Sequence, residues 1–252
     1  MKVKNIKSFI EFYKSLEISD SIGRYPRIEN KNQLKQINTE KLKSKEALDD
    51  NLIDMEEKLF ALLSEIKNAD CNLKDIATNL VFSDGKEKSD IMLIGEAPGA
   101  DEDKIGKPFI GQAGKLLDQM FELIGLSREN NFYITNIVFW RPPGNRTPNS
   151  QEIKVCLPYT KKHISIIKPK LLILLGNVAT KSILQTDQGI TKIRGKEHFY
   201  FDESVNLKIP TRAIYHPAYL LRNPIEKKKM WEDLIDIYDF LTKNNIINKN
   251  EK

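Results

Sequence analysis

Four side chains in this sequence have types and positions that could do chemistry on a flat heterocyclic ligand. Asn136 stands near the end of an apolar run, and its carboxamide offers one acceptor and one donor to the edge of a base. His216 follows another apolar run, where its ring could donate a hydrogen bond to charge developing on a leaving group. Phe109, in a loop framed by glycines, could stack on a planar ligand. Glu96 lies in a glycine-rich turn, residues 95–99, that lets backbone N–H groups approach a ligand.

Each of these features also has a structural explanation when it is taken alone. The glycine turn could simply lead into an acidic loop at 101–103, and the asparagine could tie down a neighbouring loop. The histidine could cap a turn, and the phenylalanine could fill the core. Two nucleotide motifs are excluded, because a GxGxxG fingerprint needs glycine at Ala97 and a P-loop needs lysine at Gln112.

The elements that position these side chains follow from the hydrophobic pattern. Short apolar runs alternate with amphipathic segments, which predicts parallel strands covered on both faces by helices. We therefore expect an α/β fold, a three-layer α/β/α sandwich around a four-stranded parallel central sheet. The predicted strands are 91–95, 132–138, 171–176 and 209–215, and the predicted helices are 113–124, 150–167, 177–184 and 225–241.

Ligands of such sheets bind beyond the carboxyl ends of the strands. That rule gathers residues 95–103, 136–148 and 216–222 on one rim, and with them three of the candidate side chains, Glu96, Asn136 and His216. The other two histidines are expected on the surface, His163 in a helix and His198 in a polar, hairpin-like stretch.

The N-terminal quarter has a different pattern. Residues 1–16 and 48–66 carry apolar residues at helical spacing, and residues 24–47 between them are a polar linker with few apolar side chains. We expect an N-terminal helical extension over 1–67 and the main domain over 68–252.

Composition narrows the function classes. The chain has 252 residues and a net charge of +5, which permits a polyanionic partner without requiring one. Its longest apolar run is far shorter than the roughly 20 residues of a membrane span. Two cysteines are too few for a disulfide framework, and the basic start lacks the apolar core of a secretory signal, so we expect a cytoplasmic protein.

Taken in order, five motifs resemble those of the family 4 uracil-DNA glycosylases. They are GEAPGADEDKIGKPFIGQAGKLLD, YITNIVFWRPPGNRTP, LLILLGNVA, ITKIRG and YHPAYLLRNP, and the resemblance extends over about residues 68–241. It implies an enzyme that flips uracil out of DNA and hydrolyses its N-glycosidic bond, leaving an abasic site.

The resemblance implies a role for each candidate residue. Phe109 would stack on the flipped base in a pocket built with Gly95 and Ala97, while Asn136 would bind the uracil N3–H and O4. His216 would donate a hydrogen bond to the uracil O2, and Glu96 would help to position water or the pocket backbone. Some superfamily members carry Asp where this chain has Ala97, so the group that activates the water stays open.

The resemblance also implies contacts with uracil-containing DNA by what we expect to be a monomer. The loop 217–222 would enter the minor groove, with one of three apolar side chains filling the space that the base leaves. Cations near the rim would bind phosphates. The candidates are Tyr219, Leu220 and Leu221 for the wedge, and Arg141, Arg146 and Arg222 for the phosphates.

One departure from the family pattern concerns a cofactor. Family members typically hold a 4Fe-4S cluster with four cysteines, and the matching positions here are Asn68, Cys71, Trp140 and Cys156. Neither a carboxamide nor an indole is a normal ligand of such a cluster. We therefore predict that the cluster is lost and that the chain has no cofactor. The alternative is a catalytically degenerate relative that binds DNA or uracil without turnover.

Overall fold

The computed structural model describes residues 54–247, and its centre is one six-stranded sheet with the order β1-β3-β2-β4-β6-β5. The four inner strands run parallel, whereas β1 and β5 pair antiparallel at the two edges. The predicted four-stranded parallel core is confirmed, with one short strand added on each side. The strands are β1 (Asp84–Gly85), β2 (Ile91–Gly95), β3 (Phe132–Asn136), β4 (Leu171–Leu175), β5 (His198–Asp202) and β6 (Leu207–Ile214).

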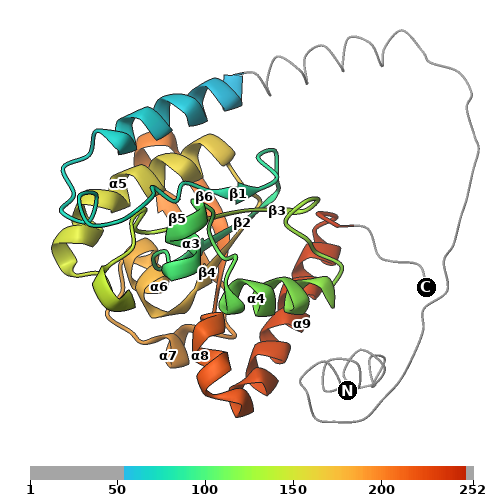
Figure 1. Cartoon of the computed structure of the whole chain (residues 1–252). Helices are drawn as coiled ribbons and strands as arrows, with labels where there is room; N and C mark the ends of the chain where they lie inside the picture. Colours follow the sequence, from blue (N-terminus) through green and yellow to red (C-terminus); the bar gives the residue numbers. More distant parts are fainter. Residues whose placement is uncertain (1–53, 248–252) are drawn as a thin grey trace, which may run out of the picture. The chain divides into compact units, whose positions relative to one another are not determined.

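Helices cover both faces of this sheet (Figure 1). On one face, the helix of residues 54–67, α5 and α6 join strand residues such as Met92 and Leu172 in a single apolar core. On the other face, Phe121 of α4 packs against Phe132 at 5.5 Å between ring centroids, and Asp236 of α9 pairs with Arg212. The predicted three-layer sandwich is thus present. The labelled helices are α3 (Ala100–Ile105), α4 (Gln112–Glu122), α5 (Ser150–Ile167), α6 (Gly176–Leu184), α7 (Ile190–Ile193), α8 (Pro217–Arg222) and α9 (Lys227–Lys243). The 3-10 turns are η1 (Pro143–Asn145), η2 (Glu203–Val205) and η3 (Pro224–Glu226).

The start of α5 shows how local sequence fixes an element. Asn149 accepts a hydrogen bond from the Glu152 backbone N–H at 2.9 Å, and the Glu152 carboxylate accepts one from the Asn149 N–H at 2.8 Å. This reciprocal capping box satisfies two N–H groups that the first turn of a helix leaves open. The capping box therefore fixes where the loop before α5 ends and the helix begins.

The boundary of the main domain lies earlier than the sequence indicated. Leu59, Leu62 and Ile66 of the helix 54–67 are buried in the core, and the compact unit that contains them begins at Met55. This helix therefore belongs to the domain and not to a separate extension that ends at residue 67. The predicted helix 1–16, the linker 24–47 and residues 48–53 lie outside the described residues.

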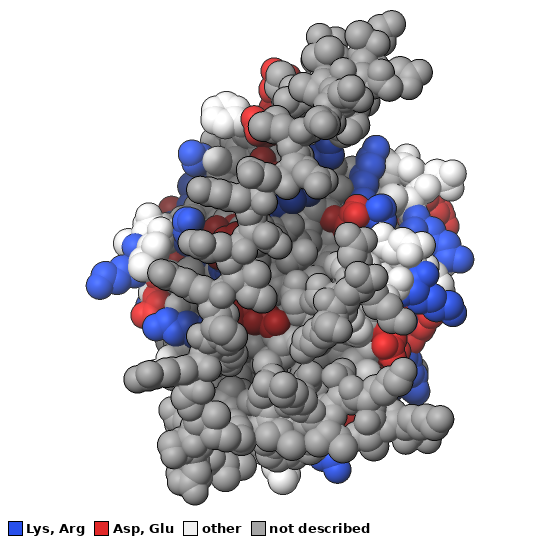
Figure 2. Space-filling model, turned by 90° about the vertical axis from the view of Figure 1, so that its right-hand side faces the viewer, with Lys and Arg blue, Asp and Glu red and all other residues white. Residues whose placement is uncertain are grey.

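On the face drawn in Figure 2, the coloured parts show Lys and Arg side chains interspersed with Asp and Glu. Within residues 54–247, no helix is long and apolar enough to cross a membrane.

His163 of α5 is buried, and its expected surface position is wrong. The ring contacts Phe82 at 4.5 Å and stacks with Phe139 at 5.7 Å between centroids, and Nδ1 lies 3.1 Å from the Tyr133 hydroxyl. Its Nε2 has no hydrogen-bond partner among the described residues. Burial lowers the pKa of His163 to about 3, so the folded protein holds a neutral ring. His198, by contrast, lies half-buried on edge strand β5, whose antiparallel pairing with β6 matches the hairpin-like stretch that was expected.

The buried histidine predicts a specific loss of stability in acid. Between about pH 6.5 and pH 3 the unfolded chain takes up a proton that the folded ring refuses, so the free energy of unfolding falls with pH. From pH 7 to pH 5 this group contributes a loss of about 2 kcal/mol. Urea unfolding at both pH values should show this additional loss in the wild type relative to His163→Gln. Equal pH dependence in the two proteins would contradict the prediction.

Candidate active site

A pocket of about 380 Å³ opens beyond the carboxyl ends of the central strands, on the rim that the sequence indicated. Its wall is formed by the segment after β2, the end of β3, the loop that precedes α5 and the start of α8. Segments far apart in the chain therefore share one cavity. The lining residues are Glu96, Ala97, Pro98, Gly99, Glu102, Phe109, Ala113, Asn136, Pro142, Asn145, Arg146, Thr147, His216, Ala218, Tyr219 and Arg222.

Asn136 ends β3 and presents an unsatisfied acceptor to this pocket. The residue is 1% exposed, and its Oδ1 has no hydrogen-bond partner among the described residues. An unpaired buried polar group costs about 1–3 kcal/mol, so the position favours a ligand that donates a hydrogen bond there. Gly95 makes room for it, because a Cβ at residue 95 would overlap both Asn136 Oδ1 and the Phe109 ring.

Phe109 is held in an uncommon backbone conformation against His216. Its φ of 54° lies in the left-handed region, which costs a bulky residue on the order of 1–3 kcal/mol. Its ring lies 5.6 Å from that of His216, tilted by 35°. The aromatic face, the imidazole and the Asn136 amide thus border the same cavity.

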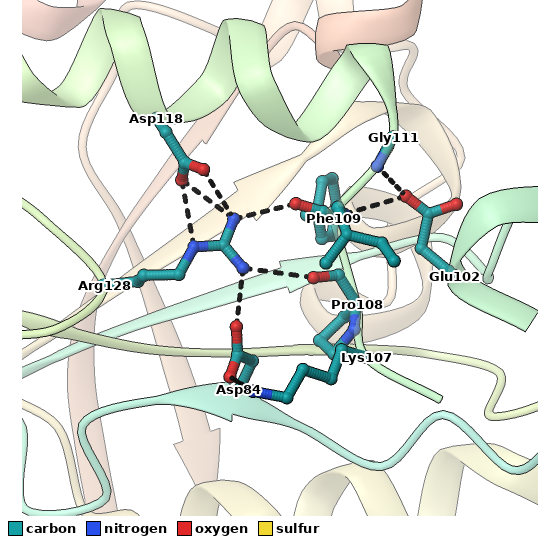
Figure 3. A network of polar contacts seen from close by, with 9 residues as sticks. Asp84, Glu102, Lys107, Pro108, Phe109, Gly111, Asp118 and Arg128 are labelled. Carbon is teal, nitrogen blue, oxygen red and sulfur yellow. Dashed lines mark hydrogen bonds and ion pairs between the residues drawn. The ribbon is translucent and has the colours of Figure 1, made fainter. Parts of the chain in front are cut away.

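Two charged residues that the sequence did not single out fix the loop of Phe109 (Figure 3). The Glu102 carboxylate accepts hydrogen bonds from the backbone N–H groups of Gly99, Ile110 and Gly111 at 2.9–3.1 Å. Arg128 donates to the carbonyl oxygens of Pro108 and Phe109 at 3.2 and 2.8 Å. The expected acidic loop at 101–103 is instead helix α3, and a glycine followed three residues later by Glu is a capping pattern that could have indicated this.

His216 is the N-cap of α8 and has a defined tautomer. Its Nδ1 accepts a hydrogen bond from the Ala218 backbone N–H at 3.2 Å, so a neutral ring carries its proton on Nε2. Burial, with a smaller contribution from the positive charge of Arg222, lowers the pKa of His216 to about 4. Gly176 permits this packing, because a Cβ there would lie 2.8 Å from His216 Cβ. The site therefore offers a neutral hydrogen-bond donor.

Glu96 is the carboxylate of the β2 turn at this pocket. Burial raises its pKa, while a hydrogen bond to Thr147 and the charge of Arg222 oppose that rise. Ala97 beside it lines the pocket but has no polar side chain, so the acidic group of this turn is Glu96 alone.

The predicted DNA-contacting cations are in different situations. Arg222 and Arg146 line the pocket, but Arg146 is tied to the buried Glu152 carboxylate by two hydrogen bonds of 2.7 and 2.9 Å. Arg141 lies outside the lining and donates to Asn145 Oδ1 at 2.7 Å. Within the described part of the chain, Arg222 has no ion-pair partner and keeps its charge available at the rim.

The segment predicted to insert into the minor groove has a different secondary structure from the one expected. Residues 217–222 form helix α8 and not a loop, with Pro217 at its first turn. Leu220 is 0% exposed and packs inside, so its proposed role as a wedge is wrong for this structure. Leu221 is 41% exposed, and Tyr219 lines the pocket.

The four positions that match the family's cluster do not fit it. Cys71, Trp140 and Cys156 are buried in the apolar core, together with side chains of the helix 54–67. The Asn68 side chain turns back and donates to the Ser64 carbonyl of its own helix at 3.0 Å. No group of three metal-binding side chains is arranged for a metal ion among residues 54–247. Only two cysteines are present where four are needed.

The tautomer and acidity of His216 can be tested by NMR. Two-bond ¹H–¹⁵N spectra should show the proton on Nε2 at pH 7 and a pKa of about 4. Arg222→Gln should raise that pKa without restoring the ordinary value, since burial is the larger cause. Arg141→Gln is the matched control. A proton on Nδ1, or a pKa near 6.5, would contradict the geometry described above.

Comparison with known proteins identifies the family to which this pocket belongs. The model of the Uracil DNA glycosylase superfamily matches residues 82–235, which include every residue of the pocket lining. A Type-4 uracil-DNA glycosylase of Sulfurisphaera tokodaii is 46% identical over 169 residues, 65% of this chain and 75% of the relative. Type-4 enzymes of Pyrobaculum aerophilum and Saccharolobus solfataricus are 38% and 43% identical, covering 67% and 68% of this chain and 87% and 81% of theirs. This chain belongs to the uracil-DNA glycosylase superfamily.

Proposed function

We propose that the protein is a monofunctional uracil-DNA glycosylase that flips uracil out of DNA and hydrolyses its N-glycosidic bond. The observation that carries this proposal is the unpaired Oδ1 of Asn136 in a pocket shared with the Phe109 ring and a neutral His216. A base inside a duplex is unreachable, so such a pocket serves a nucleotide extruded from the stack at a cost of a few kcal/mol.

Asn136 and Phe109 provide recognition of the base. Asn136 Oδ1 accepts the uracil N3–H, and its Nδ2 donates to O4, while the Phe109 ring stacks on the base. Cytosine presents an acceptor at N3 and a donor at N4, which is the reverse pattern. Its binding would leave buried polar groups mismatched, and this is the stronger kind of discrimination.

His216 stabilises the leaving group. When the bond between N1 and the sugar C1′ breaks, its electron pair moves into the uracil ring and negative charge grows at O2. The Nε2–H of His216 donates to that oxygen, and because the ring is neutral its proton stays on Nε2. A fixed donor in a water-poor pocket strengthens as charge develops and requires no reorganisation.

Glu96 positions the water that completes the hydrolysis. The water oxygen bonds to the cationic C1′ and its proton leaves to solvent, while the departing uracil anion takes up a proton from solvent, so the products are an abasic sugar and uracil. The carboxylate of Glu96 stands in the pocket wall after β2, near the charge of Arg222. Ala97 supplies no second carboxylate, so water orientation rests on Glu96 and the pocket backbone.

DNA contacts are proposed for the outer surface of α8. Leu221 is the exposed apolar residue that fills the gap left by the flipped base, with Tyr219 at the pocket edge. Arg222, and to a lesser extent Arg141 and the carboxylate-bound Arg146, contact phosphates. We further propose that the protein acts as a monomer in the cytoplasm.

We also propose that the chain carries no iron–sulfur cluster and no other cofactor. The poor fit of Asn68 and Trp140 to a four-thiolate site supports this view, and no step above uses a metal. The same departure favours the second candidate, a degenerate relative that binds DNA or uracil without turnover. The complete pocket favours the enzyme, and an assay of excision separates the two.

The assay uses a uracil-containing oligonucleotide, followed by alkaline cleavage of abasic sites. Asn136→Ala and His216→Ala should each reduce the single-turnover rate by about 10²–10³-fold, because each removes a contact to the base or its developing charge. Asn130→Ala and His198→Ala, which change the same residue types outside the pocket, should leave the rate unchanged. Wild-type protein that binds the DNA but yields no breaks at stoichiometric amounts would favour the degenerate relative.

The cofactor proposal has its own measurement. Protein purified without oxygen should be colourless and contain no iron, and treatment with an iron chelator should leave both its melting temperature and its excision rate unchanged. A brown preparation with about four irons per chain would overturn it.

A further inference from the structure

Arg128 uses its whole guanidinium on one set of partly buried contacts beside the pocket (Figure 3). Nε and Nη2 bind the Asp118 carboxylate at 2.8–3.1 Å, and Nη1 binds Asp84 at 2.7 Å. The remaining bonds go to the carbonyl oxygens of Pro108 and Phe109. Arginine has five N–H donors, and the six contacts of Arg128 engage both its terminal nitrogens and Nε. Its side chain is only 12% exposed.

Arg128 and Glu102 hold the same short loop from opposite ends. Arg128 binds two successive carbonyl oxygens, those of residues 108 and 109, and Glu102 binds the next two N–H groups, those of residues 110 and 111. The left-handed Phe109 lies between them. Four backbone groups in a row are thus fixed by two side chains of opposite charge, which sets the direction of the Phe109 ring.

The anchor of Arg128 is rigid because its carboxylates come from two different elements. Asp118 belongs to α4 and Asp84 to edge strand β1, and Asp84 also binds Lys107, at the start of the same loop, at 3.3 Å. A lysine could not replace the arginine, since its single ammonium group has three donors and no planar fork to reach both carboxylates and both carbonyls.

We infer that Arg128 is a positioning residue for base recognition, which orients the Phe109 ring for stacking before the base arrives. The inference rests on the proposed function. Arg128 is not among the residues that line the pocket, so it acts through Phe109. Stacking on a ring that is already oriented avoids the cost of ordering the loop during base flipping.

A double-mutant cycle tests this role. Arg128→Lys should lower the single-turnover excision rate on the order of 10- to 100-fold and weaken inhibition by free uracil by a similar factor. Affinity for undamaged DNA should stay within about twofold of wild type. In a Phe109→Ala background the same change should have less than about threefold further effect, because the ring through which it acts is gone. Equal losses in both backgrounds would overturn the inference.

Two further variants separate positioning from general destabilisation. Arg212→Lys changes another buried arginine, which pairs with Asp236 and lies under the Phe240 ring away from the loop, and it should leave excision and uracil inhibition unchanged. Asp118→Asn keeps Arg128 but weakens its anchor, and should give a smaller effect of the same pattern. A loss of rate in Arg212→Lys equal to that in Arg128→Lys would contradict a specific role.

Hydrogen exchange provides a readout that does not depend on activity. The amides of Ile110 and Gly111 should exchange faster in Arg128→Lys than in wild type, while the amides of β2 and β4 keep their protection. If the wild type excised no uracil, the proposed function would fail while this result could still show the loop to be held by Arg128. Unchanged exchange at both amides would overturn the inference itself.

Discussion

The unpaired acceptor of Asn136 is the constraint on which the rest of the site depends. A buried carbonyl oxygen without a donor is unfavourable, and the fold accepts this cost at the end of a fully buried central strand. The strand pairs with β2 on one side and with β1 on the other, which fixes its backbone in the sheet. Gly95, directly opposite in the register, removes the one side chain that would fill the space. The arrangement of the strands therefore leaves the Asn136 Oδ1 without a hydrogen-bond donor among residues 54–247.

The other groups of the pocket are equally fixed in advance. The Ala218 N–H decides which nitrogen of His216 carries the proton, and burial decides that the ring is neutral. The Phe109 loop takes a conformation that the isolated chain would disfavour, and Glu102 and Arg128 compensate with hydrogen bonds to its backbone. In the proposed function, recognition and leaving-group stabilisation come from fixed dipoles, which require little rearrangement when charge develops.

The sequence predicted the parts of this structure that depend on local pattern. Continuous apolar runs located the four parallel strands, and the predicted bounds of α5 and β2 match the structure to the residue. The rim rule then brought Asn136 and His216 to one pocket. Strand β1 has only two residues and leaves no pattern, so it was missed.

What the sequence could not reveal depends on contacts between distant segments. Arg128 meets Asp84 and Phe109 across 44 and 19 positions, so nothing in its neighbourhood indicates its role. A single histidine in a helix does not disclose that aromatic rings enclose it, as they do His163. The amphipathic pattern of residues 48–66 predicted a helix but not the surface that it covers.

Helix α8 joins two functions in one small rigid body. His216 caps its beginning, and the neighbouring residues Leu220 and Leu221 lie near its end, one turned into the core and the other toward solvent. Successive residues of a helix point about 100° apart, so this division follows directly from the helical geometry. The buried Leu220 fixes this short helix to the core. Because His216 and Leu221 belong to the same helix, a displacement of the exposed leucine would also displace the imidazole.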